Sequence, residues 1–323
     1  MVHMSIESSL LIVNGKAGNG QATELSQVLN AETGIRSEHF GNFLLALECV
    51  GDADTAAFLE SYSNLFILGG DGSTLSLMRL LLQQQLRQDI TVAALGMGGE
   101  NVVAKETGTF KKPLKTIRAV LTGAYQKEAV IPLSVTAEKS EIAEPFLWSV
   151  HMGFSAAVLA ELEEMRSMGM GDFRRRYQAT LQTLFRQRQL DPTYVSLNGE
   201  STQSVLDVGV LSAALPYWTS KFRLATVPHS PALLHTVQGY DELQKEPGRF
   251  SSRLLLEVLA LKFGLNIPYR LLQHQPLASG FSVEISSPSG QMAIDSEVSD
   301  SAESTVTDKD FYPGGGKVFL ARF

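Results

Sequence analysis

A glycine-rich loop, Gly69-Gly70-Asp71-Gly72-Ser73, follows a short apolar run and offers the clearest chemistry in the sequence. Its three glycines free the backbone to adopt unusual conformations and leave room for a phosphate to approach closely. The helix that follows presents unpaired N–H groups and a partial positive charge. Ser73 can donate to a phosphate oxygen or cap that helix, whereas Asp71 would repel a phosphate unless it holds Mg²⁺ or acts as a base. The loop therefore predicts a phosphate site beside a metal ion; the alternative is a plain strand-to-helix turn with two good capping residues.

Two similar loops flank this one in the sequence. Residues 9–13 form an apolar run that stops at Asn14-Gly15-Lys16-Ala17-Gly18, and residues 90–95 form another that enters a loop at 96–101. Each loop precedes helix-like spacing, so a strand, a glycine loop and a helix occur three times. This repeat predicts a parallel sheet with crossover helices, and the loops should gather at the carboxyl ends of its strands.

The pattern changes near residue 128. Residues 114–122 predict one more helix, and from residue 129 short strands separated by turn residues indicate a β-sandwich. The predicted strands are 130–135, 146–150, 194–197, 206–211, 222–227 and 281–285, with helical stretches at about 157–187 and 251–263, a polar loop at 299–310 and a last strand at 317–323. We therefore predict an α/β fold with a doubly wound parallel-sheet domain at 4–128, a β-sandwich domain at 129–310, and a final strand within 311–323 that can return to the first domain.

The composition narrows the function classes. Lys and Arg number 27 against 34 Asp and Glu, a net charge of −7, which argues against a nucleic-acid-binding surface. Cys49 is the only cysteine, so no intrachain disulfide can form and a reducing, cytoplasmic setting is expected. No uncharged apolar run is long enough to span a membrane, so a protein of this kind that acts on lipid would bind the membrane peripherally.

The glycine loops resemble a known family. The loop at 69–73 resembles the GGDGT signature of the diacylglycerol kinase catalytic family, which includes bacterial lipid kinases and sphingosine kinases. Asn14 to Gly18 is similar to the first loop of the family, Asn-Pro-x-x-Gly, and residues 96–108 are similar to its third loop, with Asn101 and Gly108 in register. Near the C-terminus, Asp295-Ser296-Glu297 resembles the Asp-Gly-Glu of the family. The resemblance covers almost the whole chain in the expected order.

This resemblance implies a nucleotide-binding α/β domain followed by a β-sandwich, with ATP and Mg²⁺ as cofactors and a lipid alcohol as substrate. Asp295 would take the proton from the lipid hydroxyl, and Asp71 and Glu297 would hold the metal, with Asp71 also acting in catalysis. The implied ATP contacts are Asn14, Lys16, Gly69, Gly70, Asp71, Gly72, Ser73, Gly98 and Asn101, together with Arg166 and Arg174 by similarity to the sphingosine kinase branch. The oligomeric state is not indicated.

Simpler explanations exist for the outlying residues. Asp295 and Glu297 can also be the solvated edge of a hairpin in an acidic tail. Arg166 and Arg174 can be part of a solvated helix face that carries Glu–Arg pairs, each worth a few tenths of a kcal/mol.

Several positions depart from the family pattern. Leu159 stands where the sphingosine kinase branch has the Asp that binds the sphingosine head group, so sphingosine is disfavoured as a substrate. Pro231-Ala232 stands where bacterial members carry an Asp-Gly, so a second, structural Mg²⁺ site is not expected. Gly99, Val102 and Ser296 also differ from the usual residues.

These departures leave two alternatives to a lipid kinase. One is a catalytically weak or silent lipid- or nucleotide-binding paralogue on the same scaffold. The other is an enzyme similar to NAD kinases, which share Gly-Gly-Asp-Gly but pair it with an Asn-Glu motif, whereas this chain has Glu100-Asn101 in the reverse order.

Overall fold

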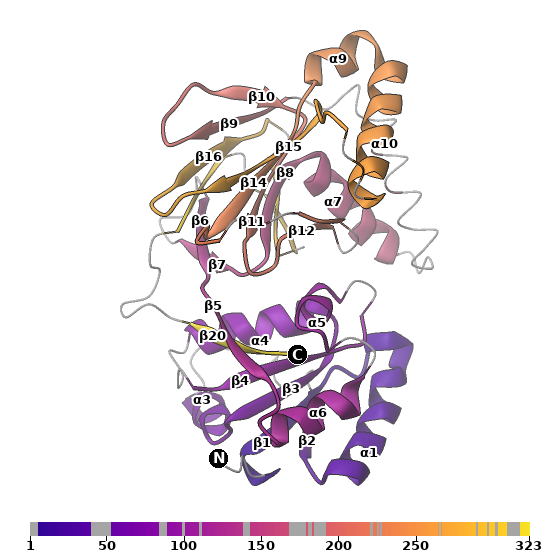
Figure 1. Cartoon of the computed structure of the whole chain (residues 1–323), viewed down its shortest axis with the longest axis vertical. Coiled ribbons are helices and arrows are strands. Elements are labelled where there is room, and N and C mark those ends of the chain that lie inside the picture. The colour runs from indigo at the N-terminus through magenta and orange to yellow at the C-terminus, as the bar shows by residue number, and fades with distance from the viewer. Residues whose placement is uncertain are drawn as a thin grey trace. The chain divides into compact units, whose positions relative to one another are not determined.

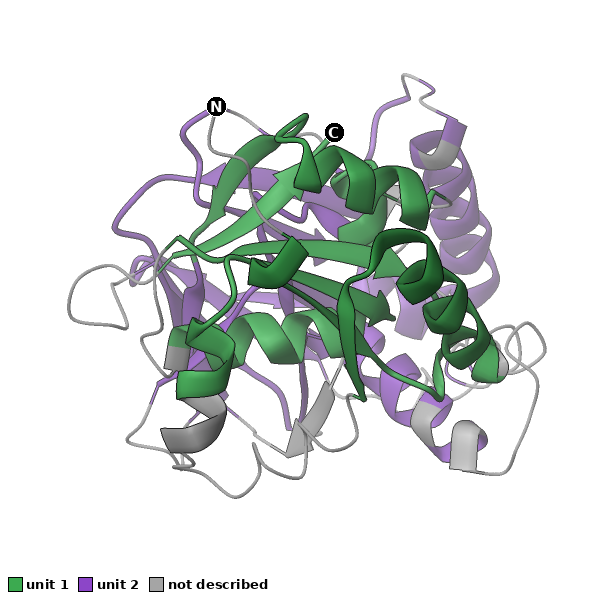
Figure 2. Cartoon of the chain, turned by 90° about the horizontal axis from the view of Figure 1, so that it is seen from below, with its two compact units in different colours: residues 1–131, 312–323 green, residues 132–311 purple. Residues whose placement is uncertain are grey.

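The chain divides into two compact units in a computed structural model, residues 1–131 with 312–323 and residues 132–311 (Figures 1 and 2). The structure describes residues 6–39, 53–83, 89–98, 101–109, 112–137, 143–167, 179, 183, 192–219, 222–224, 226, 228–263, 265, 267–288, 290–295, 297–300, 303–308 and 317–323. Within these ranges, no helix is long and apolar enough to cross a bilayer.

Unit 1 is built on a six-stranded sheet in the order β2-β1-β3-β4-β20-β5. Its strands are β1 (Ser9–Val13), β2 (Arg36–His39), β3 (Asn64–Gly69), β4 (Thr91–Gly96), β5 (Gln126–Val130) and β20 (Val318–Arg322). Every neighbouring pair is parallel except β20 with β5. The predicted parallel sheet is confirmed, and the three glycine loops follow β1, β3 and β4.

Apolar strands buried on both faces explain why helices cover both sides of this sheet (Figure 2). The helices are η1 (Ile6–Ser8), η2 (Ala17–Gly20), α1 (Gln21–Thr33), α3 (Ala53–Glu60), α4 (Asp71–Gln83), α5 (Val102–Glu106) and α6 (Pro113–Leu121). Leu11, Phe66 and Ala93 lie on neighbouring strands in register and share one face of the sheet. Leu29 of α1 and Ile117 of α6 join them in one buried cluster, so these two helices cover that face.

The last strand, β20, completes the sheet from the far end of the chain. It pairs in parallel with β4 and antiparallel with β5. Arg322 fixes its end through hydrogen bonds to Glu128 at 2.6 Å and Glu106 at 2.8 Å. Unit 1 is therefore assembled from two segments of the sequence that are separated by all of unit 2.

Unit 2 contains two six-stranded antiparallel sheets, in the orders β10-β9-β16-β19-β6-β7 and β15-β14-β11-β8-β17-β18, and a small ribbon of β12 with β13. The strands are β6 (Leu133–Ala137), β7 (Glu144–Phe146), β8 (Ser149–Gly153), β9 (Thr193–Leu197), β10 (Gln203–Val205), β11 (Asp207–Ser212), β12 (Tyr217–Thr219), β13 (Phe222–Arg223), β14 (Ala232–Val237), β15 (Leu272–Leu277), β16 (Ser282–Ser286), β17 (Gln291–Ile294), β18 (Glu297–Asp300) and β19 (Glu303–Thr307). Val283 and Val306 of the first sheet share one core with Val208 and Val210 of the second. Antiparallel sheets after the parallel one were predicted, and this is confirmed.

Three described helices accompany these sheets: α7 (Phe154–Ser167), α9 (Tyr240–Lys245) and α10 (Pro247–Phe263). Strand alternation sends Leu234 of β14 into the core between the sheets and Val237 to the opposite face. Phe250 and Leu254 of α10 pack with Val237 on that face. Helix α10 therefore covers the outer side of the second sheet (Figure 1).

The prediction of a polar loop at 299–310 is wrong, because β18 and β19 occupy much of it. In β19, Ser304 and Val306 are buried while Glu303 faces solvent. Small hydroxyl residues alternate with valine here, and their polarity conceals the two-residue period of a strand.

Two predicted strands are each split by a break. The prediction at 146–150 spans the turn between β7 and β8, and the prediction at 130–135 spans Ile131-Pro132 between β5 and β6. The predicted helix at 157–187 corresponds to α7 up to Ser167; Ala179 and Thr183 are also helical, and the other residues beyond Ser167 lie outside the described ranges.

Candidate active site

The three glycine loops meet at the carboxyl ends of β1, β3 and β4, where the backbone itself ties them together. Asn14 N donates to the Leu68 carbonyl at 3.0 Å, which joins the end of the first strand to the middle one. Met97 N donates to the Gly69 carbonyl at 2.7 Å, which joins the third strand to the middle one. The loops thus form one cluster inside unit 1.

Asn14 connects the first loop to the second. Its side-chain amide donates to the Ser73 hydroxyl at 2.8 Å, and its Oδ1 accepts the Lys16 N–H at 3.1 Å. Ser73 is buried, and the Lys16 side chain is exposed. Asn14 therefore shapes the loop and positions Ser73, while Lys16 remains open to solvent beside them.

Gly70 and Gly98 bring the second and third loops into backbone contact. A Cβ at Gly98 would lie 2.7 Å from the Gly70 Cα, and a Cβ at Gly70 would lie 3.3 Å from the Gly98 Cα. Gly69 is also constrained, because a Cβ there would lie 2.9 Å from the Ser73 side chain. These three glycines are required by packing within the protein.

Asn101 shapes the third loop from the N-terminus of α5. It adopts a left-handed conformation with φ of 54°, and its side chain is buried. Its Oδ1 accepts the Gly98 N–H at 2.7 Å, and its amide donates back to the Gly98 carbonyl. The side-chain amide of Asn101 is thus used to close the loop, a role that the motif alone did not indicate.

Asp71 connects the second loop to the helix after the third. Its Oδ1 accepts the Val103 N–H of α5 at 3.0 Å, so the carboxylate caps a helix distant in sequence. The side chain is only partly buried. A carboxylate in this position fits one ligand position of Mg²⁺, which takes one or two protein carboxylates and completes its shell with phosphate oxygens and water.

Gly72 differs from the other glycines of its loop. A Cβ there would meet no atom of the described residues within 4 Å, and Gly72 does not have a positive φ. It lies in the first turn of α4, where N–H groups have no acceptor inside the helix. Within the described part of the chain, neither packing nor backbone conformation explains the glycine.

Asp295 lies in unit 2, in the tight turn between β17 and β18, with φ of 49°. The residue is 2% exposed, so the alternative of a solvated hairpin edge is wrong for it. Its carboxylate accepts the backbone N–H groups of Leu147 at 3.1 Å, Trp148 at 2.7 Å and Ser149 at 3.1 Å. These three hydrogen bonds hold the turn between β7 and β8 in place.

The remaining predicted site residues are described only in part. Arg166 lies in α7 and Glu297 begins β18, but their side chains lie outside the description, as does the whole of Arg174. All three residues belong to unit 2.

Asp207 and Glu257 are buried carboxylates that sequence analysis did not single out. Asp207 accepts the N–H of Ser155 at 2.8 Å and its hydroxyl at 2.6 Å, which fixes the start of α7. Glu257 of α10 accepts the N–H groups of Leu271 and Leu272, both at 2.9 Å. A lone acidic residue inside an apolar stretch was the available signal in both cases.

Three histidines form a row across the second sheet of unit 2. His235 is in register with His274, and Gly209 is in register with both His151 and His235. The His151 ring fills the space above Gly209, where a Cβ would lie 2.6 Å from its Nδ1. Burial lowers the pKa of His151 to about 4 and that of His235 to about 3. Among the described residues, no group of three or more His, Cys, Asp or Glu could hold a metal.

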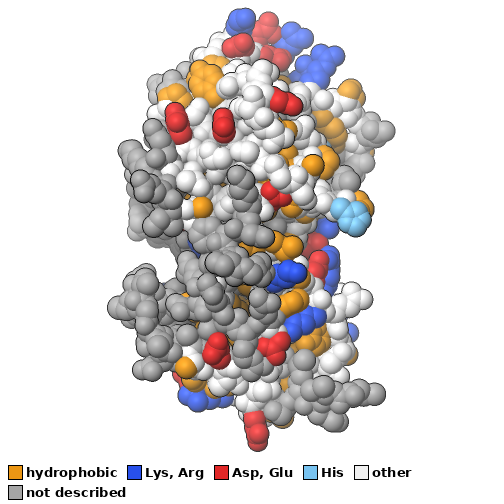
Figure 3. Space-filling view, turned by 90° about the vertical axis from the view of Figure 1, so that its left-hand side faces the viewer, with side chains coloured by type: hydrophobic (Ala, Val, Ile, Leu, Met, Phe, Trp, Pro, Cys, Tyr) orange, Lys and Arg blue, Asp and Glu red, His pale blue; other side chains and the backbone are white. Residues whose placement is uncertain are grey.

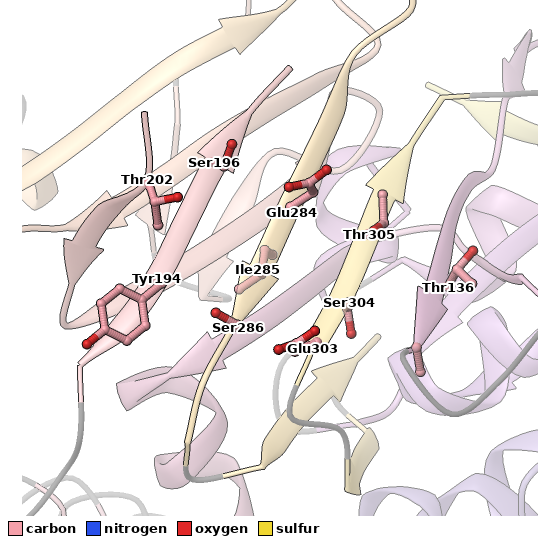
Figure 4. Close-up of a pocket in the computed structure, with 11 residues that line it drawn as sticks. Thr136, Tyr194, Ser196, Thr202, Glu284, Ile285, Ser286, Glu303, Ser304 and Thr305 are labelled. Atoms are coloured by element: carbon pink, nitrogen blue, oxygen red, sulfur yellow. The ribbon is translucent and has the colours of Figure 1, made fainter. Parts of the chain in front are cut away.

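A separate hollow of about 370 Å³ lies on the first sheet of unit 2 (Figure 4). Hydroxyl groups line it together with the carboxylates of Glu284 and Glu303, and its lining contains no cationic side chain to attract a phosphate. The molecular face in Figure 3 likewise shows acidic and basic side chains interspersed among the described residues, without a basic stripe. This hollow therefore does not compete with the glycine-loop cluster as a site for an anionic ligand.

Comparison with known proteins supports the resemblance predicted from the glycine loops. Residues 8–132 match the family model described as the diacylglycerol kinase catalytic domain. No curated protein sequence matches the chain.

Solved structures from Bacillus anthracis str. Sterne that bear the name diacylglycerol kinase have a similar fold. Three of them share 15%, 16% and 14% identity with the chain, with TM-scores of 0.59, 0.55 and 0.55, and each match covers 98% of this chain and 97% of the other. Residues 8–132 are thus similar to the diacylglycerol kinase catalytic domain, and the resemblance predicted from the glycine loops is confirmed.

Proposed function

We propose that this chain is an ATP-dependent kinase that transfers the γ-phosphoryl group of ATP to a lipid hydroxyl. Gly72 carries the proposal, because it lacks a side chain at a position where no described residue requires glycine. Glycine in a helical turn costs stability relative to alanine. A phosphate that lies against the first turn of α4 gives this glycine a purpose.

The other loop residues complete a site for the phosphates of ATP. The N–H groups of residues 71–73 supply donors, and exposed Lys16 supplies a positive charge. Asn14, Gly69, Gly70, Gly98 and Asn101 hold the loops in position through the contacts described above. Arg166 and Arg174 remain proposed phosphate contacts from unit 2.

Asp71 is the proposed metal ligand in unit 1, with Glu297 as a second carboxylate. When bound, Mg²⁺ neutralises charge on the transferring phosphoryl group. The Val103 N–H holds the Asp71 carboxylate in place. This carboxylate would therefore already be oriented as a metal ligand before the nucleotide binds.

The acceptor is proposed to be a diacylglycerol-like or sphingoid-like alcohol bound by unit 2, with Asp295 as the base that accepts the hydroxyl proton. A lipid substrate also implies that the protein visits a membrane surface from the cytoplasm. The family match and the order of the motifs support this acceptor class.

The hydrogen bonds that Asp295 accepts favour a second candidate, a silent or weakly active lipid- or nucleotide-binding protein. Three backbone N–H groups already bind this carboxylate, which gives it a structural role in the turn between β7 and β8. Such a protein would bind ATP through the loops without turnover.

Incubation with γ-labelled ATP, Mg²⁺ and a panel of diacylglycerol, sphingoid base, ceramide and other glycerolipids tests the two candidates. A kinase labels at least one lipid, and Asp71→Asn removes the label. Nucleotide binding by calorimetry with no labelled lipid across the panel would favour the silent protein.

A further inference from the structure

Helix α10 exposes an apolar stripe on the side that faces away from its sheet. Leu255, Leu256, Leu259 and Phe263 are 60%, 58%, 41% and 67% exposed, and Leu265, just after the helix, is 54% exposed. At 3.6 residues per turn, the four helical positions fall within about 100° of the circumference. Of the ten large exposed hydrophobic side chains among the described residues, four therefore lie on α10 and a fifth directly follows it.

The opposite face of α10 packs against the rest of unit 2, so the exposed stripe is not a core-facing surface that has turned outward. Phe250 and Ala260 are buried, with Phe250 in the apolar cluster under the helix. Glu257 adds three hydrogen bonds to the backbone N–H groups of Arg270, Leu271 and Leu272, at 3.0, 2.9 and 2.9 Å. These contacts fix the rotation of the helix and thereby hold the stripe outward.

The charge around the stripe has the opposite sign to that of the chain. Residues 246–270 contain Arg249, Arg253, Lys262 and Arg270 against Glu246 and Glu257, an excess of two positive charges, whereas the whole chain has a net charge of −7. Arg253 lies 3.6 Å from Glu257 in an ion pair. Glu257 is buried and bonded to the backbone. Arg249 is paired with Glu246 at 3.1 Å, but both side chains are exposed, and such surface pairs are weak enough for another anion to replace.

The geometry points to the α10 stripe as the surface that docks this protein onto an anionic lipid bilayer. An outward apolar face flanked by basic residues is the pattern of a helix that lies in the membrane interface, where apolar side chains enter the acyl boundary and cations contact anionic head groups. A protein partner would not by itself require the local positive charge. The choice of a lipid surface rests in part on the proposed function, since a kinase of lipid alcohols must reach its substrate in a membrane.

Vesicle co-sedimentation of the whole chain tests this surface. The double variant Leu256→Gln/Phe263→Gln keeps the charge and uses a good helix former, and we expect it to bind vesicles of phosphatidylcholine with phosphatidylglycerol at least roughly tenfold more weakly. Val28→Gln is the matched control, because Val28 is an exposed residue of α1, at 55%, in the other unit. Arg249→Gln should weaken binding to the anionic vesicles by about fivefold and leave binding to pure phosphatidylcholine unchanged. Thermal unfolding of each variant verifies that it is folded.

Two results would overturn the inference. One is equal vesicle binding by the double variant and the wild type. The other is a change of oligomeric state in the double variant, seen by sedimentation velocity, with vesicle binding intact, which would make the stripe a contact between copies.

The test separates this inference from the proposed function because vesicle binding needs no turnover. Wild type that binds vesicles through α10 but labels no lipid refutes the kinase and keeps the docking surface. If the wild type labels detergent-dispersed lipid but the double variant binds vesicles normally, the kinase is supported and the docking surface is refuted.

Discussion

The Asp71 carboxylate accepts the Val103 N–H at 3.0 Å, so the one acidic residue of the middle loop also caps the helix that follows the third loop. The same contact gives the loops a common framework. Together with the Asn14–Ser73 bond at 2.8 Å, it joins all three loops into one rigid cluster. Substitutions in this cluster should therefore separate into those that loosen the framework and those that only obstruct the ligand.

Gly98→Ala and Gly72→Ala should separate these two effects. A Cβ at Gly98 would lie 2.7 Å from the Gly70 Cα, and backbone must move, so we expect a loss of about 1–3 kcal/mol in the free energy of unfolding. Gly72→Ala meets no described atom within 4 Å and should raise the free energy of unfolding by up to about 1 kcal/mol, because alanine is the better helix former. It should nevertheless weaken ATP binding.

Urea denaturation and calorimetric ATP titration of both variants measure the two quantities. Unchanged ATP affinity in Gly72→Ala would remove the main support for phosphate binding at α4.

Asn14 and Ser73 should be energetically coupled. Each single alanine substitution leaves the other polar group without this partner, so the double variant should be less destabilised than the sum of the two. A coupling of about 1 kcal/mol is expected in a double-mutant cycle of unfolding free energies. Strict additivity would show that the 2.8 Å bond contributes nothing to loop stability.

Asp295→Asn should affect both stability and turnover. An amide offers one acceptor oxygen to the three N–H groups of Leu147, Trp148 and Ser149, so we expect a loss of about 1–3 kcal/mol in unfolding free energy. If Asp295 is also the base, kcat of the folded enzyme should fall at least about 100-fold while ATP affinity is unchanged.

Asp207→Asn is the matched control for Asp295→Asn, because Asp207 is another buried carboxylate of unit 2 that binds backbone and a hydroxyl. It should lose stability and keep most of its kcat. Equal losses of kcat in the two variants would assign Asp295 a structural role.

The buried histidines should make the protein less stable in acid. The unfolded chain binds protons on histidine below a pKa of about 6.5, whereas burial lowers the pKa of His151 in the folded state to about 4. Between these values the unfolded state holds more protons, so the free energy of unfolding falls as pH falls. For His151 the full effect is of order 3 kcal/mol.

Unfolding by urea at several pH values between 7 and 4 measures this dependence. His151→Phe keeps a ring above Gly209 and should flatten the curve, whereas replacing exposed His229 with Gln should leave it as in the wild type. A curve in His151→Phe as steep as that of the wild type would contradict the assignment.

Local sequence signals predicted the parallel sheet. The features that these signals missed depend on hydrogen bonds and contacts between residues far apart in the chain. β1, β3 and β4 could be predicted because each is a short, largely apolar run that leads into a glycine-containing loop. The turn between β7 and β8 could not, since it depends on Asp295, which is 147 residues from Trp148 in the chain. Asn101 and Gly70 are similar cases: the motif marks them as important, but only the folded loops show that Gly98 is the partner of both.

The central claim is that these loops hold ATP for transfer to a lipid, and mass spectrometry of a cell lipid extract tests it most directly. The protein is incubated with the extract, Mg²⁺ and ATP carrying ¹⁸O in its γ-phosphate. We predict a lipid monophosphate that contains the heavy oxygens and is absent when Asp71→Asn replaces the wild type. A folded wild type that binds ATP yet yields no heavy lipid phosphate would contradict the claim.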